Sequence, residues 1–141
     1  MQFSHPPDDL LVSMEADIFS LSSPSHADFI DGSIGEGSTF HKTFGYYAHG
    51  VAEETAILPP AWKDRLITLR NENTAGAAGL CLEVHDLAIS KLFARREKDL
   101  EFVRTLLRHP LTNSEILKTR LTSVTVAHDR MTEGLARLNQ L

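Results

Sequence analysis

The chain has 141 residues, 42% of them hydrophobic and 23% charged, and this length and balance predict one globular domain spanning residues 1–141. The formal net charge of −5 argues against a protein that coats nucleic acid. There is no apolar run long enough to span a bilayer and no basic-then-apolar signal at the N-terminus, so we expect a cytoplasmic protein.

Residues 1–9 contain two adjacent prolines and two adjacent aspartates, which predict a terminal arm ahead of a core at residues 10–107. From Leu10 to Leu21 apolar and polar residues alternate, as is typical of a strand. Glu15 and Asp17 then share one face, with their Cα atoms about 6.6 Å apart. Such a pair of carboxylates can hold one divalent cation or bridge two, and Mg²⁺ bound to a triphosphate needs only one or two of them. The alternative is an exposed polar strand face without a ligand.

The elements expected next are short. A helix is expected within residues 25–37, ended by glycines, and residues 71–79 predict a loop without the Lys-Ser/Thr ending of a phosphate-binding P-loop. The seven histidines have no metal-ligand spacing, so we expect ordinary surface or core roles for them. Three short strands are predicted, at about Gly45–His49, at Ile57–Leu58 and over Leu66–Leu69.

Residues 80–107 are the most strongly patterned segment. Apolar residues recur there at three- and four-residue steps, which predicts two amphipathic helices meeting near Arg95–Lys98. Glu83 is expected to cap the first helix and Asp99 the second, because carboxylates accept the free amide hydrogens at a helix start. Cys81 is the only cysteine, which excludes an internal disulfide and a cysteine-based zinc site, and we expect a buried structural thiol.

Three cations share this segment: Lys91, Arg95 and Lys98 fall within about 60° of one another if the first helix continues through them. One interpretation is a solvated helix face. The other is a clamp for the phosphate oxygens of a nucleotide. Residues 1–80 carry a net charge of −7 and residues 81–141 a net charge of +2, a division that suits a metal ion and a polyphosphate but can also arise without a function.

Residues 108–141 predict C-terminal helices that serve packing. One is expected from Ser114 to Leu121 after a capping box at Thr112–Glu115, and the other from Val126 to Leu138.

Taken together, these elements resemble a minimal nucleotidyltransferase-like family of small bacterial proteins of largely unassigned function. This family is distantly similar to the nucleotidyltransferase toxins of abortive-infection toxin–antitoxin systems. Three segments carry the resemblance, the last of them the most specific: SMEAD (Ser13–Asp17), IGEGSTFHKTFGYYAHGV (Ile34–Val51) and HDLAISKLFARREKDLEF (His85–Phe102).

The resemblance implies roles for the residues already singled out. Glu15 and Asp17 match the catalytic, metal-binding acid pair of the family. Lys91 matches its helix lysine, and its R-x-x-K-D signature, expected near the nucleotide phosphates, is matched by Arg95, Lys98 and Asp99. The implied reaction transfers a nucleotidyl group from a nucleoside triphosphate to a hydroxyl of RNA or protein, and Mg²⁺ activates the attacking oxygen and stabilises the leaving pyrophosphate.

The sequence also departs from the family pattern. Members usually carry a strand ending in a Gly-Ser turn ahead of the acidic strand, and the residues before Leu10 do not show one. Glu15 stands where the wider superfamily usually has Asp. A third carboxylate is expected on a later strand, and the open alternatives for it are Asp64, Glu53, Glu54 and Glu72.

The predicted fold is α/β or α+β, a small mixed sheet with helices packed on it. An incomplete sheet exposes an edge, which predicts a homodimer that covers this edge. Two functions remain open. One is a Mg²⁺-dependent, toxin-like nucleotidyltransferase, and the other is a degenerate scaffold that binds a nucleotide or a protein without catalysis.

Overall fold

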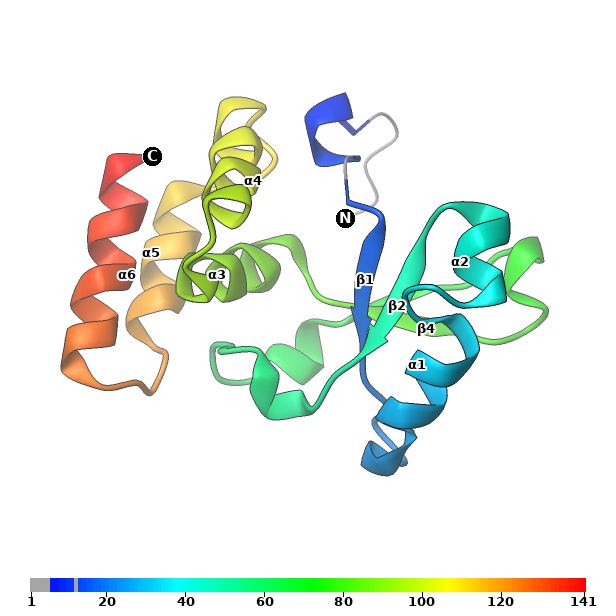
Figure 1. Cartoon of the computed structure of the whole chain (residues 1–141). Helices are drawn as coiled ribbons and strands as arrows, with labels where there is room; N and C mark the ends of the chain where they lie inside the picture. Colours follow the sequence, from blue (N-terminus) through cyan, green and yellow to red (C-terminus); the bar gives the residue numbers. More distant parts are fainter. Residues whose placement is uncertain (1–5, 12) are drawn as a thin grey trace. The chain divides into compact units, whose positions relative to one another are not determined.

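The structure, a computed structural model, describes residues 6–11 and 13–141. Residues 1–5 of the expected arm and Val12 of the expected first strand lie outside these ranges. Within them the strands and α-helices, in chain order (Figure 1), are β1 (Glu15–Ile18), α1 (Ala27–Ile34), α2 (Thr39–Phe44), β2 (Tyr47–Gly50), β3 (Ile67–Leu69), β4 (Gly79–Cys81), α3 (Val84–Ala94), α4 (Glu97–Arg108), α5 (Ser114–Thr122) and α6 (His128–Gln140). Short 3-10 helices are η1 (Asp8–Leu10), η2 (Pro24–His26), η3 (Glu53–Thr55), η4 (Trp62–Arg65) and η5 (Glu72–Thr74).

Helices dominate and the strands are short, so the fold class is α+β, as predicted. The chain divides into a small unit, Leu10–Ala56, and a large unit, Met1–Asp9 with Ile57–Leu141. Among the described residues the strands form two separate two-stranded sheets instead of one mixed sheet, because β1 and β2 belong to the small unit and β3 and β4 to the large one. The expected single domain stays a prediction.

In the small unit, β1 and β2 pair in parallel, with Asp17 opposite His49. Parallel neighbours need a crossover connection, and here it contains α1 and α2 (Figure 1). The Ser38 side chain caps α2 by accepting the backbone N–H of His41. Gly45 ends α2 in the left-handed region, at φ 78°, which favours glycine and turns the chain into β2.

Helix α1 packs very closely on β2. A Cβ atom at Gly50 would lie 2.2 Å from the carbonyl oxygen of Ala27, so only glycine fits there. Asp31 Oδ1 accepts the Gly50 N–H at 2.7 Å, which fixes α1 to the end of the strand. Of the buried hydrophobic side chains in the described residues, Ala48 is the one that the small unit contributes.

The large unit holds most of the hydrophobic core. Helix α3 contacts α4, α5 and α6, and its apolar side chains are buried among theirs (Figure 1). The Arg137 Nη1 donates to the carbonyl oxygen of Leu92 at 2.7 Å, which satisfies a carbonyl in the last turn of α3. The fully buried side chains include Ala88, Ile89, Leu92, Val103, Leu106, Leu117 and Leu121.

A buried carboxylate links three segments of the large unit. Asp86, on α3, accepts hydrogen bonds from Arg65 Nε at 2.8 Å and from Arg120 Nη1 at 2.9 Å. Arg120 also donates to Glu83, and burial, which alone would lower the pKa of Arg120, is outweighed by these two acids, so the pKa is raised. A buried charge is tolerated when it is paired in this way.

Most helices lie where the pattern predicted them, and the differences have physical reasons. The first central helix is capped by the Glu83 side chain, as predicted. The N-cap position of the second is held by Arg96, whose side chain makes no capping hydrogen bond, so the prediction for Asp99 is wrong. Asp99 lies within the first turn of α4 and pairs with side-chain cations instead. The side chain that caps α5 is Asn113, one residue after the expected Thr112.

Two further expectations are wrong, and one helix was missed. Ile57 and Leu58 are not in a strand, because Pro59 and Pro60 follow them directly. Cys81 is exposed on β4, since that three-residue strand has exposed residues throughout. Helix α2 was not predicted, because its aromatic residues are also typical of strands.

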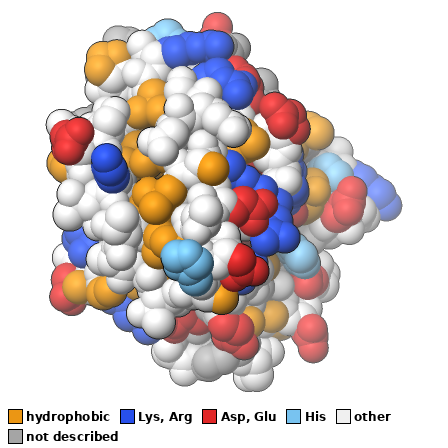
Figure 2. All heavy atoms as spheres, turned by 90° about the vertical axis from the view of Figure 1, so that its left-hand side faces the viewer, with side chains coloured by type: hydrophobic (Ala, Val, Ile, Leu, Met, Phe, Trp, Pro, Cys, Tyr) orange, Lys and Arg blue, Asp and Glu red, His pale blue; other side chains and the backbone are white. Residues whose placement is uncertain are grey.

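The helices of the described chain include none with the length and apolar composition that crossing a membrane requires. Viewed from the side on which α6 lies in Figure 1, Lys and Arg side chains are interspersed with Asp and Glu (Figure 2). On this face the described residues form no continuous basic field of the kind that nucleic-acid coating needs.

Candidate functional site

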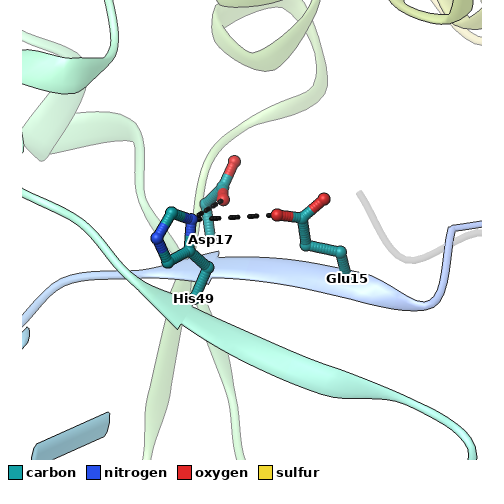
Figure 3. A group of neighbouring side chains, drawn as sticks. All are labelled: Glu15, Asp17 and His49. Carbon is teal, nitrogen blue, oxygen red and sulfur yellow. Dashed lines mark ion pairs between the residues drawn. The ribbon is translucent and has the colours of Figure 1, made fainter. Parts of the chain in front are cut away.

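Three side chains converge on the strand pair of the small unit. Glu15 and Asp17 project from one face of β1, as the alternation along a strand requires, and His49 reaches toward both from β2 (Figure 3). His49 Nδ1 lies 3.8 Å from Glu15 Oε1 and 3.9 Å from Asp17 Oδ1. One donor atom of each residue lies within 4.8 Å of the others. The parallel register, with Asp17 opposite His49, fixes this arrangement.

An open pocket of 310 Å³ lies beside these residues, and its surroundings are acidic. Residues 10–56 contain seven Asp or Glu and one Lys, a net charge of −6. The pKa of the Tyr47 hydroxyl is raised, first by desolvation and then by the negative charges of Glu15, Glu36 and Asp17. Such a field attracts cations. The pocket is lined by Glu15, Asp31, Glu36, Tyr47, Ala48 and His49.

The donor set fits a divalent cation. Around an ion with bonds of about 2.1 Å, neighbouring ligand atoms lie about 3 Å apart and opposite ones about 4.2 Å apart. The distances from His49 Nδ1 to the two carboxylates, 3.8 and 3.9 Å, fall in this range. The side chains of Asp17 and His49 are about half exposed, at 53% and 54%, so water or phosphate oxygens can complete the coordination.

His49 is the member of this cluster that the sequence did not reveal. Its spacing to other histidines is not that of metal ligands. The sequence did predict a strand that ends at His49, but only the parallel pairing with β1 shows that this histidine lies opposite Asp17. The four acids considered as the third carboxylate do not lie on strands: Asp64 is in η4, Glu53 and Glu54 are in η3, and Glu72 is in η5. The side chain that joins the two acids from a later strand is His49, on β2, and it is not a carboxylate.

A second cluster lies in the large unit, where α3 and α4 meet. Lys91 Nζ lies 3.0 Å from Asp99 Oδ1, and Arg96 Nε donates to Asp99 Oδ2 at 2.6 Å. Burial alone would raise the pKa of Asp99, but the hydrogen bonds and charges of Arg96 and Lys91 lower it below its ordinary value. Lys91 Nζ also lies 5.8 Å from the centre of the Phe102 ring, a favourable position for a cation.

The predicted stripe of Lys91, Arg95 and Lys98 does not form, because it required the first helix to continue through all three residues. Arg95 adopts the left-handed conformation, at φ 66°, and ends α3, so the helix does not run on through Lys98. Arg95 instead pairs with Glu133 of α6, with Nη2 and Oε2 2.7 Å apart. Lys98 is exposed in the first turn of α4.

The structure therefore brings the predicted residues together in two groups. Glu15 and Asp17 lie together in the small unit, and Lys91 and Asp99 lie together in the large unit. Arg96, which the sequence did not single out, is a second partner of Asp99.

Comparison with known proteins identifies a family for most of the chain. A family model described as "Nucleotidyltransferase of unknown function (DUF6036)" matches residues 30–137, about three quarters of the chain. The matched range contains His49, Lys91 and Asp99, and it begins after β1 with its two acids. Neither a curated protein nor a solved structure matches the chain.

Proposed function

The chain belongs to this family of nucleotidyltransferases of unknown function, and we propose that it transfers a nucleotidyl group from a nucleoside triphosphate to a hydroxyl acceptor with the help of a divalent cation. The observation that carries the proposal is the convergence of Glu15, Asp17 and His49 on one strand pair of a chain from such a family. A triphosphate is delivered to an enzyme as a metal complex, so the acid pair is the natural place for it to bind.

In this proposal Glu15 and Asp17 hold the cation. When bound, a divalent cation would neutralise charge on the phosphates and activate the attacking oxygen. The cation expected from the sequence is Mg²⁺. Through this cation the two carboxylates would position the phosphate chain. Glu15 lines an acidic pocket that disfavours a triphosphate without its cation. The open side of the pocket leaves room for the acceptor.

The Lys91 cluster is proposed to bind phosphate oxygens. Asp99 is a positioning residue here, since its buried carboxylate holds the Lys91 ammonium at one place while a quarter of the Lys91 side chain stays exposed. Arg96 shares Asp99, so the group carries two cations for one acid and has a net charge of +1. Arg95 and Lys98 belong to the same proposed phosphate region at the junction of α3 and α4.

The acceptor is proposed to be a hydroxyl of RNA or protein, as in a toxin-like enzyme. A single cysteine and a nucleoside triphosphate substrate both fit a cytoplasmic protein.

A second candidate function is a scaffold that binds a nucleotide or a protein without catalysis. Internal charge pairing favours it, because Lys91 is engaged by Asp99 and Arg95 by Glu133. Cations held by their own carboxylates give less to a ligand than free ones.

Thermal unfolding with Mg²⁺ and each nucleoside triphosphate tests the proposal. Ligand binding to the native state raises the free energy of unfolding, by about 2.7 kcal/mol at a ligand concentration of 100 times Kd. The unfolding midpoint rises as a result. We expect a triphosphate to raise the midpoint only with Mg²⁺, and we expect the Glu15→Ala/Asp17→Ala double variant and the Lys91→Ala variant each to lose this effect.

The exposed residues Asp28 and Lys118 supply matched controls. Asp28→Ala and Lys118→Ala should keep the full nucleotide effect. A wild-type midpoint that no nucleotide moves would contradict nucleotide binding. A shift that survives in the double variant would exclude the acid pair as the place where the metal complex binds.

A further inference from the structure

His49 has a side chain that the fold does not need for packing. It is 54% exposed, and its Nδ1 atom is directed at both carboxylates of β1 (Figure 3). Two chemical states explain such an arrangement: an imidazolium paired with two acids, or a neutral imidazole that shares a cation with them. Exposed ion pairs contribute about 0–1 kcal/mol, so a pairing role alone gives the fold little.

The register of the sheet makes His49 a fixed donor. It lies opposite Asp17 in the parallel pair, and the next residue, Gly50, is fixed by the Asp31 side chain and by its close contact with Ala27. A donor attached to a backbone held this way approaches the two acids from a defined direction, which is what a metal site requires.

A nitrogen donor changes which ion such a site prefers. Mg²⁺ is bound almost entirely by oxygen and keeps much of its water. First-row transition ions gain affinity from imidazole, and among them Mn²⁺ also shares the preference of Mg²⁺ for carboxylate and water oxygen. Two carboxylates and one imidazole therefore suit Mn²⁺ better than Mg²⁺.

We propose that Glu15, Asp17 and His49 form a three-ligand centre for a divalent first-row transition ion, represented by Mn²⁺, with His49 bound through Nδ1. This rests on the proposed function, whose cation it identifies. The three protein ligands occupy half of an octahedron, and the other positions remain for water and for phosphate oxygens on the open side of the pocket.

The test is direct titration of the purified chain with Mn²⁺ and with Mg²⁺ by calorimetry, together with pulsed electron paramagnetic resonance of the Mn²⁺ complex. We expect Mn²⁺ to bind at least tenfold more tightly than Mg²⁺, and we expect the spectrum to show modulation from a directly bound imidazole nitrogen. His49→Ala should remove that modulation and weaken Mn²⁺ at least tenfold. His49→Asp should give a site with three carboxylates, and it should bind Mg²⁺ more tightly than His49→Ala does.

The control is His26→Ala, because His26 is an exposed histidine of the same unit outside the cluster. It should leave both affinities unchanged, and circular dichroism of each variant checks that it folds. If Mn²⁺ binds without nitrogen modulation, or if His49→Ala still binds Mn²⁺ at least tenfold more tightly than Mg²⁺, the proposal is overturned. The acid pair of the proposed function would then remain as the metal site. If wild type binds neither ion, or Glu15→Ala/Asp17→Ala binds both normally, this inference and the metal site of the proposed function fall together.

Discussion

At the scale of single residues, Asp99 is the most firmly held member of the predicted site. Only 2% of its side chain is exposed, and Lys91 and Arg96 both contact it. The sequence predicted that Asp99 caps the second helix, and this was wrong, because its carboxylate pairs with Lys91 and Arg96 instead. A carboxylate near a helix start has the same appearance in sequence whether it caps the backbone or pairs with cations from a neighbouring helix.

The charge state of Asp99 makes the stability of the protein depend on pH. A folded-state pKa below the ordinary value of 3.8 means that ionised Asp99 stabilises the fold above that value, and this contribution is lost as the pH falls through the folded-state pKa. We expect Asp99→Asn to lower the free energy of unfolding by about 2 kcal/mol at pH 7. The difference from wild type should shrink as the pH falls from about 5 to 3, as urea unfolding at several pH values would show.

Glu97→Gln is the control for this variant, because Glu97 is exposed in the same first turn of α4. It should change stability by less than about 0.5 kcal/mol. An Asp99→Asn variant that is as stable as wild type at pH 7, or whose deficit is the same at every pH, would show that the paired carboxylate does not stabilise the fold.

At the scale of elements, the junction of α3 and α4 shows where sequence reasoning stops. The apolar periodicity predicted both helices and the place where they meet. It did not predict the left-handed conformation of Arg95 at that junction, because a left-handed residue other than glycine carries no local signal. The break is accompanied by contacts from α6: Glu133 pairs with Arg95, and Arg137 binds the Leu92 carbonyl. Contacts across about 40 residues of sequence are visible only in the folded chain.

The strand pair of the small unit has edges that a second copy can cover. Within the described residues β1 and β2 pair only with each other, and apolar side chains near them are exposed, among them Met14 at 61% and Ile18 at 40%. We expect the chain to form a homodimer through this sheet. Ile18→Lys should weaken the dimer at least tenfold in sedimentation equilibrium, because it places a charge on the strand.

Ile116→Lys is the matched control, since Ile116 lies on α5 of the large unit and is exposed to nearly the same extent, 39%. It should leave the association unchanged. A wild-type chain that stays monomeric at all concentrations, or a dimer that tolerates Ile18→Lys, would exclude this sheet as the interface.

At the scale of the whole molecule, the sequence predicted the fold class and the family, and it predicted that Glu15 and Asp17 lie on one face of a strand. Glu15 and Asp17 were readable because they lie two residues apart on one strand. His49 was not, since its position depends on the pairing of strands about 30 residues apart. The single mixed sheet was not correct either, because strand runs of three or four residues do not specify their partners.

We propose that this molecule transfers a nucleotidyl group. The most direct measurement gives the purified chain Mn²⁺ or Mg²⁺ and a nucleoside triphosphate labelled on either the α- or the γ-phosphate. Protein-free total bacterial RNA and the chain itself serve as acceptors. We expect the α-label to enter one acceptor with release of pyrophosphate, no entry of the γ-label, and no transfer by Glu15→Ala/Asp17→Ala. The absence of α-label transfer by wild type, or transfer that the double variant retains, would contradict the claim.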